Sequence, residues 1–316
     1  MRFNLLAHKA ILIVLGFALC LNFQVAAKAN PGRPTTNYEV ISSKSLRADL
    51  LKASKLTKLT GVITPPLTKP RTVSNLYSTR CHLMVFDTKY GDCIFGDKKS
   101  EKTLFLFGDS HAAQWFPAIE DIANKYGYKL YALTKSACGI STVIPKMARL
   151  GGKPYKTCED AQNYVINKIT EVKPDLVILA SRLIDEKGPR GKSWFSGMTE
   201  QLKKIKTAAD GKVIYLGDTP YPGFEVAQCL LNNPNQITKC NSSLKSAKQN
   251  DLSGPGAKAA ANAGVVYVSL VDWFCSSKNC PAILNNVLLY IDYSHITTEA
   301  SKMYSPLLYK ELDKFL

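Results

Sequence analysis

The stretch TLFLFGDSHAAQWFPAIEDIANKYG, residues 103–127, joins a short apolar run to a long amphipathic segment. Thr103–Phe107 has the composition of a strand buried on both faces, and Ala112–Tyr126 has the spacing of a helix. Gly108 permits a tight turn between them. Ser110 then lies at the start of the helix, where free backbone N–H groups and the helix dipole favour negative charge such as a developing oxyanion. The stretch therefore predicts either a serine nucleophile or an ordinary helix cap.

The same alternation of apolar and helix-like segments continues to the end of the chain. Four further runs are short and mostly apolar, at residues 129–133, 175–180, 212–216 and 265–270. Helix-like stretches occupy residues 159–172, 193–209, 245–263 and 298–316. This alternation predicts a three-layer α/β/α sandwich around a mostly parallel, five-stranded sheet. In such folds, functional groups gather at the carboxyl ends of the strands.

A second polar cluster precedes the last helix-like stretch, in LLYIDYSHITTEA, residues 288–300. Asp292 and His295 are three residues apart, a spacing that lets the carboxylate accept the imidazole Nδ1–H and leaves Nε2 for a serine. Apart from the first 27 residues, the chain offers only His82, His111 and His295 as a general base. Taken with a serine at the end of the first strand, this spacing favours a catalytic role for His295.

The first 27 residues differ in character from the rest of the 316-residue chain. Arg2 and Lys9 precede an apolar run over residues 10–21, and Val25-Ala26-Ala27 offers the small residues of a cleavage site. This pattern is typical of an export signal. The run is shorter than the roughly 20 residues of a membrane span, and an uncleaved N-terminal anchor is the second interpretation. We therefore expect an exported protein of the periplasm or cell envelope.

Residues 28–80 form a basic, proline-containing lead-in segment, and residues 81–316 form the main domain. Within the lead-in segment, leucines near helical spacing predict one basic amphipathic helix over residues 45–59. That helix is expected to lie on the main domain or on a membrane surface.

Nine cysteines are a second indication of export. With Cys20 in the signal set aside, eight remain, and an even number in an exported chain implies disulfides. They fall into neighbouring couples, whose short loops close at little entropic cost, and we expect the bonds Cys81–Cys93, Cys138–Cys158, Cys229–Cys240 and Cys275–Cys280. A zinc site is the rival interpretation, but the spacing of paired zinc ligands is missing.

The net charge of +16 favours anionic partners. For an exported protein, acidic glycans, phospholipid headgroups or cell-wall polymers fit this charge better than nucleic acid, which we do not expect as a partner. A solvated Lys-rich surface without a specific partner is the simpler interpretation.

The two polar blocks resemble those of the SGNH hydrolases, and more closely those of the SGNH-like domains attached to membrane acyltransferases of the acyltransferase-3 type. The resemblance covers residues 81–316 and is carried by FLFGDSHAAQWFPAIE and DYSHIT. It implies the SGNH-hydrolase (flavodoxin-like) fold, with Ser110 as nucleophile and Asp292 and His295 as its triad partners. Further matches, whose cysteines support the local disulfides, are TKSACG, PDLVILASR, GDTP ahead of Cys229 and CSSKNCPAILNNVLLYID.

The chain departs from the wider family in the blocks that complete the oxyanion hole. The family has a glycine and an asparagine there, and Gly139 is expected to stand for the glycine. After the third strand, Ala180-Ser181-Arg182 replaces the family's Gly-x-Asn-Asp. We expect Arg182 to bind substrate, to stabilise charge or to hold the loop.

Two neighbours of the serine are expected to support it. Asp109 would bond the backbone near Ser110, and His111 would orient the turn. A rival interpretation builds a metal site from Asp109, His111, Asp292 and His295, whose side chains suit a metal-activated water, but it leaves Ser110 without a purpose. We expect neither a metal nor a cofactor.

The resemblance implies an exported serine-dependent O-acyltransferase that acts on an envelope or surface polysaccharide through an acyl-enzyme on Ser110. The partners would be an acyl donor and a glycan acceptor. The multi-helix membrane domain of the attached versions is missing from the sequence, so we expect a stand-alone form that acts alone or receives acyl groups from a separate membrane acyltransferase.

Two alternatives stay open. One is a carbohydrate O-acetyl esterase or lipase-like hydrolase with the same triad, which would differ only in acceptor binding and water exclusion. The other is a non-catalytic glycan-binding module with a degenerate hydrolase fold. The missing asparagine favours the second alternative, and the retained Ser110, Asp292 and His295 argue against it.

Overall fold

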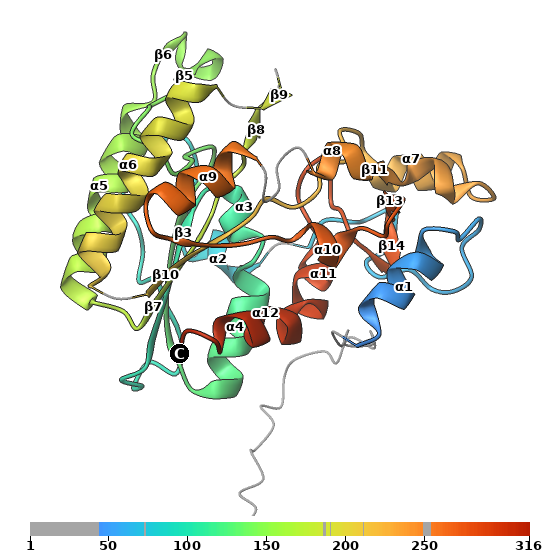
Figure 1. Cartoon of the computed structure of the whole chain (residues 1–316), viewed down its shortest axis with the longest axis horizontal. Coiled ribbons are helices and arrows are strands. Elements are labelled where there is room, and N and C mark those ends of the chain that lie inside the picture. The colour runs from blue at the N-terminus through green and yellow to red at the C-terminus, as the bar shows by residue number, and fades with distance from the viewer. Residues whose placement is uncertain (1–43, 73, 186–187, 190, 211, 249–253) are drawn as a thin grey trace, which may run out of the picture. The chain divides into compact units, whose positions relative to one another are not determined.

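The computed structural model describes residues 44–316, apart from residues 73, 186–187, 190, 211 and 249–253 (Figure 1). The predicted export signal or anchor, residues 1–27, and the first part of the lead-in segment lie outside the described residues. The described residues belong to one compact unit of the chain.

A mostly parallel sheet forms the centre of the fold, as the sequence predicts. Its long strands are β3 (Thr103–Gly108), β4 (Lys129–Lys135), β7 (Leu176–Ala180), β10 (Lys212–Leu216) and β12 (Val266–Val268). They lie in the order β4–β3–β7–β10–β12, and all neighbouring pairs are parallel. All five coincide with apolar runs of sequence, because a strand covered on both faces needs apolar side chains on both.

Two short edge strands extend the predicted five-stranded sheet to seven strands in the described part of the chain. β1 (His82–Leu83) pairs parallel with the end of β4, and β2 (Ile94–Gly96) pairs antiparallel with its start. The Cys81–Cys93 disulfide joins the two residues that immediately precede these strands. Both strands are too short to leave a period-2 pattern in the sequence.

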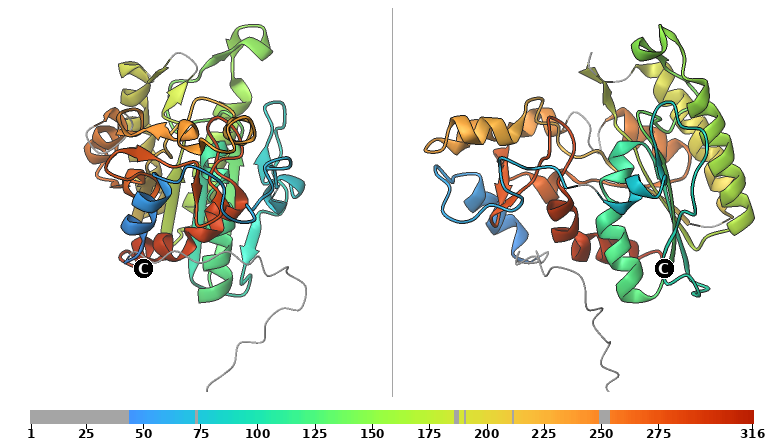
Figure 2. Two further views of the ribbon diagram at one scale, coloured as in Figure 1. Left: turned by 90° about the vertical axis from the view of Figure 1, so that its right-hand side faces the viewer. Right: turned by 180° about the vertical axis from the view of Figure 1, so that it is seen from behind.

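Helices cover both faces of the sheet, which completes the predicted three-layer sandwich (Figures 1 and 2). On one face lie α5 (Lys156–Val172), α6 (Lys192–Ala209) and α9 (Pro255–Asn262). On the other face lie α4 (Phe116–Tyr126), α11 (Thr298–Met303) and α12 (Ser305–Leu312), with α11 and α12 both packed on α4.

Three predicted helices are interrupted in the structure. The first, predicted over residues 112–126, covers the end of α3 (Ser110–Ala113) and then α4, and the last contains α11 followed by α12. The stretch over residues 245–263 contains α8 (Leu244–Lys248) and α9, which begins with a proline in its first turn. A proline is tolerated there because the first N–H groups of a helix have no partner within it.

Smaller elements fill the connections between the long ones. Two short helices are α7 (Val226–Asn232) and α10 (Val271–Phe274), and a 3₁₀ turn covers Ile237–Cys240. Another 3₁₀ turn, Ala148–Leu150, lies between β5 (Lys146–Met147) and β6 (Lys153–Pro154), which pair in a hairpin. The other two-stranded pairings are β8 (Ile184–Asp185) with β9 (Gly188–Pro189), β11 (Ser242–Ser243) with β13 (Asn279–Cys280), and β14 (Ile283–Leu284) with β15 (Val287–Leu288).

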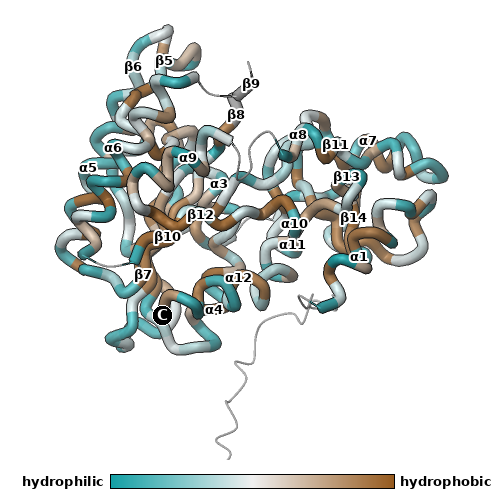
Figure 3. The backbone as a smooth tube through the Cα atoms, in the orientation of Figure 1, coloured by the Kyte–Doolittle hydropathy of each residue, from teal (hydrophilic) through white to brown (hydrophobic). Residues whose placement is uncertain are grey.

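The main hydrophobic core lies on both sides of the central strands. All five residues of β7 are buried, and the apolar stretches of the backbone follow β7 and β10 (Figure 3). Gly108 ends β3 with φ at +148°, and a Cβ there would lie 1.8 Å from the carbonyl oxygen of Ala180. Only glycine fits this approach, which holds the turn before Ser110 against the end of β7.

The described part of the lead-in segment packs onto the main domain. It contains α1 (Leu46–Ala53) and α2 (Asn75–Ser78), and Leu46, Leu50 and Leu76 are buried in the main core. The backbone of Thr64 also pairs with Val287. The helix predicted over residues 45–59 thus forms only over its first half and lies on the domain surface.

The cysteines pair as the sequence predicts, in the bonds Cys81–Cys93, Cys138–Cys158, Cys229–Cys240 and Cys275–Cys280. No helix among the described residues combines the length and the hydropathy that crossing a membrane requires.

Candidate active site

The strand order places a topological switch point between β3 and β7, because the chain passes from β3 to β4 on one side and then to β7 on the other. Open α/β sheets bind ligands at such a point, beyond the carboxyl ends of the strands. A cavity of about 850 Å³ lies there, lined by residues that follow β3, β4 and β7 and by the loop before α11.

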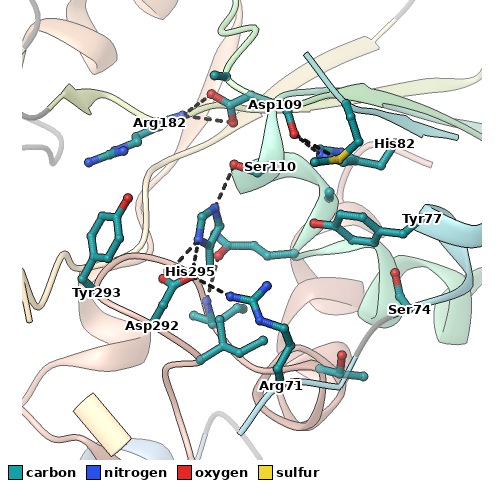
Figure 4. Close-up of a pocket in the computed structure, with 18 of the residues that line it drawn as sticks. Arg71, Ser74, Tyr77, His82, Asp109, Ser110, Arg182, Asp292, Tyr293 and His295 are labelled. Atoms are coloured by element: carbon teal, nitrogen blue, oxygen red, sulfur yellow. Dashed lines mark hydrogen bonds and ion pairs between the residues drawn. The ribbon is translucent and has the colours of Figure 1, made fainter. Parts of the chain in front are cut away.

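Ser110, His295 and Asp292 form a continuous chain of hydrogen bonds on the cavity wall (Figure 4). His295 Nε2 lies 2.8 Å from Ser110 Oγ, and His295 Nδ1 lies 2.9 Å from Asp292 Oδ2. The sequence analysis singled out these three residues in two separate blocks, and Ser110 and Asp292 are 182 positions apart. The structure brings all three together. These distances suit a hydroxyl nucleophile, a general base and an orienting carboxylate.

The loop before α11 fixes the carboxylate of Asp292. Its Oδ1 accepts hydrogen bonds from the backbone N–H groups of Ser294 and His295, each at 2.8 Å. Burial alone would raise the pKa of Asp292, but the hydrogen bonds and the charge of His295 outweigh it and hold the pKa well below its usual range. Asp292 therefore stays ionised and keeps the His295 imidazole in one orientation.

Asp109 holds the turn that presents the serine. It is the N-cap of α3, and its Oδ1 accepts a hydrogen bond of 2.8 Å from the backbone N–H of His111. Its Oδ2 accepts a second bond of 3.0 Å from the backbone N–H of Arg182. The Asp109 carboxylate therefore connects the turn after β3 to the loop after β7. Asp109 was expected to bond the backbone near Ser110, and the bond to the loop after β7 is an additional contact.

His111 forms a buried pair with Asp218, a residue that the sequence analysis did not assign to the site. Asp218 Oδ1 lies 2.6 Å from His111 Nδ1, and Asp218 Oδ2 accepts a 2.9 Å bond from the backbone N–H of Leu183. Burial alone would lower the pKa of His111, but the charge and hydrogen bond of Asp218 raise it above the usual value. The His111 ring lies 4.7 Å from the His295 ring, centre to centre. Asp218 follows strand β10 in GDTP, so the strand-end rule could have identified it.

Arg182 lines the cavity and packs against two tyrosines. Its guanidinium lies over the rings of Tyr221 and Tyr293, at 5.2 and 5.7 Å from their centres, and Nη2 donates to the Tyr221 hydroxyl. In Figure 4, the Arg182 side chain lies on the same side of Ser110 as Tyr293. The residue that replaces the family's asparagine is thus held in a fixed place at the cavity.

Gly139, the expected oxyanion-hole glycine, is not among the described residues that line the cavity. A Cβ on it would be 3.0 Å from the Trp194 ring and 3.7 Å from Asp109 Oδ2. Among the described residues that line the cavity, this loop contributes Ser136 and Ala137 instead. A role for Gly139 in the oxyanion hole stays a prediction.

Two further residues of the cavity gave no local signal in the sequence. Arg71, from the lead-in segment, lies with Nη2 3.5 Å from Asp292 Oδ2. His82, on β1, bonds Thr134 Oγ1 through Nδ1 and Ser136 Oγ through Nε2, each at 2.9 Å. Both depend on tertiary contacts with distant segments, which no local spacing reveals.

The four side chains of the rival metal site bind different partners and do not converge. His111 Nδ1 faces Asp218, whereas Asp109 accepts from backbone N–H groups. Within the described residues, no three His, Cys, Asp or Glu side chains are grouped to hold a metal ion.

Comparison with known proteins agrees with the fold and the sequence blocks. Residues 80–310 match the family of SGNH domains that are fused to AT3 domains. No curated protein sequence gave a match. The periplasmic domain of a lipopolysaccharide acetyltransferase from Salmonella Paratyphi A is similar in structure, with a TM-score of 0.53, 19% identity and coverage of 68% of this chain and 85% of that one.

Two hydrolase structures from Bacteroides are more distant. A GDSL-like lipase from Bacteroides thetaiotaomicron has a TM-score of 0.42 and 16% identity, over 68% of this chain and 90% of that one. A putative acylhydrolase from Bacteroides fragilis has a TM-score of 0.41 and 15% identity, over 71% and 91%. The family match covers most of the chain, and the chain therefore belongs to the SGNH family, whose chemistry is that of acyl groups and esters.

Proposed function

We propose that this protein is a serine-dependent O-acyltransferase that moves an acyl group onto a hydroxyl of an envelope or surface polysaccharide. The observation that carries the proposal is the hydrogen-bonded chain from Ser110 through His295 to Asp292, which opens on a cavity of about 850 Å³. That volume lies within the range of small-molecule sites and is large enough for a saccharide.

In the first half of the reaction, Ser110 Oγ attacks the carbonyl carbon of an acyl ester or thioester. His295 Nε2 takes the hydroxyl proton, and the tetrahedral intermediate collapses as His295 returns that proton to the leaving group. Asp292 stays ionised and stabilises the imidazolium that forms between these steps. The product is an ester of Ser110.

In the second half, a sugar hydroxyl takes the place of the leaving group. His295 removes its proton, the sugar oxygen attacks the acyl carbon, and Ser110 recovers its proton as the new ester departs. The backbone N–H of Ser110, at the start of α3, is our candidate for one oxyanion donor, and Gly139 stays a second candidate.

Ester hydrolysis by the same residues is the second candidate function. His295 is 26% exposed and the cavity opens to solvent, so water can reach the acyl-enzyme. Transfer requires that a bound sugar exclude this water. The triad is the same for acyl transfer and for hydrolysis, so its geometry alone does not distinguish the two functions.

The test compares the full-length protein with its Ser110→Ala variant on p-nitrophenyl acetate, with and without candidate glycans. Ester cleavage that depends on Ser110 supports the acyl-enzyme, and acetylated glycan in the products then identifies a transferase. Release of acetate alone identifies an esterase. Equal inactivity of the two folded proteins, also with an added acyl-donating membrane partner, contradicts the proposal in favour of a glycan-binding module.

A further inference from the structure

The active-site cavity is lined by positive charge from three separate segments. Among the described lining residues, Arg71 comes from the lead-in segment, Lys146 and Arg149 from the β5–β6 hairpin, and Arg182 from the loop after β7. Figure 4 shows Arg71 and Arg182 on opposite sides of Ser110. Lys146 and Arg149 are exposed and line the cavity, so solvent and ligands can reach them.

The carboxylates of the described cavity wall are already engaged. Asp109 is 1% exposed and accepts backbone hydrogen bonds from both neighbouring loops. Asp292 is held by His295 and by two backbone N–H groups. Asp292 also lies near Arg71, but the Arg71 side chain remains 66% exposed and keeps much of its guanidinium accessible. The charge presented to a ligand is therefore positive.

We propose that the cavity binds an acidic saccharide, with its carboxylate or phosphate group held by Arg71, Lys146 and Arg149 while a sugar oxygen lies at Ser110. This inference rests on the proposed function and narrows its substrate from a polysaccharide in general to an anionic one. A cleft lined by one sign of charge concentrates ligands of the opposite sign. Guanidinium groups bind carboxylates and phosphates through paired hydrogen bonds.

A saccharide fits this site better than a membrane surface does. The positive residues surround a hollow, whereas attraction to anionic lipid headgroups needs a basic surface that can approach the bilayer plane. The cavity is also lined by Tyr77 and Tyr293. Tyrosine presents an apolar ring and a polar hydroxyl, which together suit the mixed surface of a sugar ring.

The test measures binding by calorimetry with the full-length Ser110→Ala protein, so that no ester is consumed. Two matched pairs serve as probes: trigalacturonate against its methyl ester, and phosphorylated maltotriose against maltotriose. The first pair tests carboxylate and the second phosphate. At about 0.05 M salt we expect at least one acid to bind about 10-fold more tightly than its neutral partner, and the ratio to fall several-fold at about 0.5 M salt.

Two further substitutions locate the binding charge. Arg149→Gln in the same background is expected to weaken binding of the preferred acid about 5-fold and to change binding of its neutral partner less. Lys212→Gln is the matched control, because Lys212 is an exposed cation at the start of β10, the end of the strand away from the cavity. It should leave both affinities within about twofold.

Several results would overturn the inference. These are equal affinity for acid and neutral partner in both pairs, no binding of either acid, or an equal effect of the two substitutions. Binding of phosphatidylglycerol vesicles with the same dependence on Arg149 would identify a lipid surface instead.

Hydrolysis of p-nitrophenyl acetate by the unaltered protein is measured in parallel. Activity without acid preference rejects only this inference, whereas ester chemistry that does not depend on Ser110, or that stays absent with an added acyl-donating membrane partner, rejects the proposed function.

Discussion

Asp218 shows how a single residue can position two parts of the candidate active-site cavity. One oxygen bonds the imidazole of His111, next to Ser110, and the other bonds the backbone N–H of Leu183, next to Arg182. Asp109 accepts hydrogen bonds from the backbone N–H groups of His111 and Arg182, in the same two segments. Two buried carboxylates thus hold the loop that lacks the family's asparagine.

The first prediction concerns the charge of His111. In Asp218→Asn, the neutral amide removes the interaction that raises the His111 pKa, so burial should make the imidazole neutral near pH 7. We expect a loss of about 2–3 kcal/mol in the free energy of unfolding at acidic to neutral pH.

The sign of this effect follows from the raised pKa of His111. Its stabilising contribution is full below the unfolded-state pKa of about 6.5 and is lost as the pH rises through the folded-state pKa. The stability difference between the two proteins should therefore shrink at alkaline pH. Urea denaturation across a pH series measures this difference, and a ¹⁵N NMR titration reports the charge of His111. A neutral His111 in the unaltered protein at pH 6 would contradict the prediction.

The second prediction concerns Ser110 and His295 as a unit. Either Ser110→Ala or His295→Ala should lower kcat for p-nitrophenyl acetate by about 10³-fold or more, and the double variant should lose no further activity. The measurement is a double-mutant cycle on proteins with equal circular dichroism spectra. Multiplying losses would show that the two residues act independently.

The residues of the candidate site differ in how well sequence alone could predict them. Ser110, Asp292 and His295 were predictable because each lies in a compact block with its own spacing signal. Arg71 and His82 were not, because their roles arise from contacts with Asp292 and with the end of β4. Gly139 was expected as the counterpart of the family's glycine, but it is not among the described residues that line the cavity.

At the scale of elements, prediction succeeded where local and tertiary requirements coincide. The five long strands were predictable because strands covered on both faces need continuous apolar runs. The break between α3 and α4 was not predictable from helical spacing, and it lies at Gln114, whose side chain accepts a bond from the backbone N–H of Ile296, 182 residues later. The edge strands β1 and β2 are fixed mainly by β4 and by the Cys81–Cys93 bond.

The third prediction concerns the pairing of β1 with β4 through His82. Burial, followed by the positive charges of His295 and Lys135, lowers the pKa of His82 to about 3. A lowered folded-state pKa means that the contribution of His82 to stability is present above about pH 6.5 and is lost as the pH falls towards the folded-state value. The loss can reach about 1.4 kcal/mol per pH unit in this window.

The matching variant is His82→Gln, which keeps a polar group but cannot titrate. The free energy of unfolding of the unaltered protein should fall more steeply between about pH 6 and pH 4 than that of the variant. The contributions of Asp292 and His111 are common to both proteins and cancel in the difference. If the free energies of unfolding of the two proteins change equally with pH, the pKa of His82 is not lowered in the folded protein and the prediction is wrong.

At the scale of the whole molecule, the disulfides and the positive charge point to the same environment. Four disulfides are typical of proteins that fold in an oxidising compartment outside the cytoplasm. The net charge of +16 favours anionic partners, which for an exported protein would include acidic glycans. All four bonds close short loops, of 5 to 20 residues in sequence separation. The disulfides therefore stabilise local structure, whereas segments far apart in the sequence are held together by the strand pairings of the sheet.

The last prediction separates stability from catalysis with two of these bonds. Cys138–Cys158 ties the loop that carries Ser136 and Ala137 to the first turn of α5, beside the cavity, whereas Cys229–Cys240 joins α7 to a 3₁₀ turn outside the cavity lining. Replacing either pair by serines should lower the free energy of unfolding by about 3 kcal/mol, because the loop entropy depends only logarithmically on sequence separation, which is 20 for the first bond and 11 for the second. Only loss of Cys138–Cys158 should also raise KM for p-nitrophenyl acetate, by about 3-fold or more, because it frees one cavity wall. Urea denaturation and steady-state kinetics on both variants measure the two effects, and an equal rise in KM for both would mean that the bonds act only through global stability.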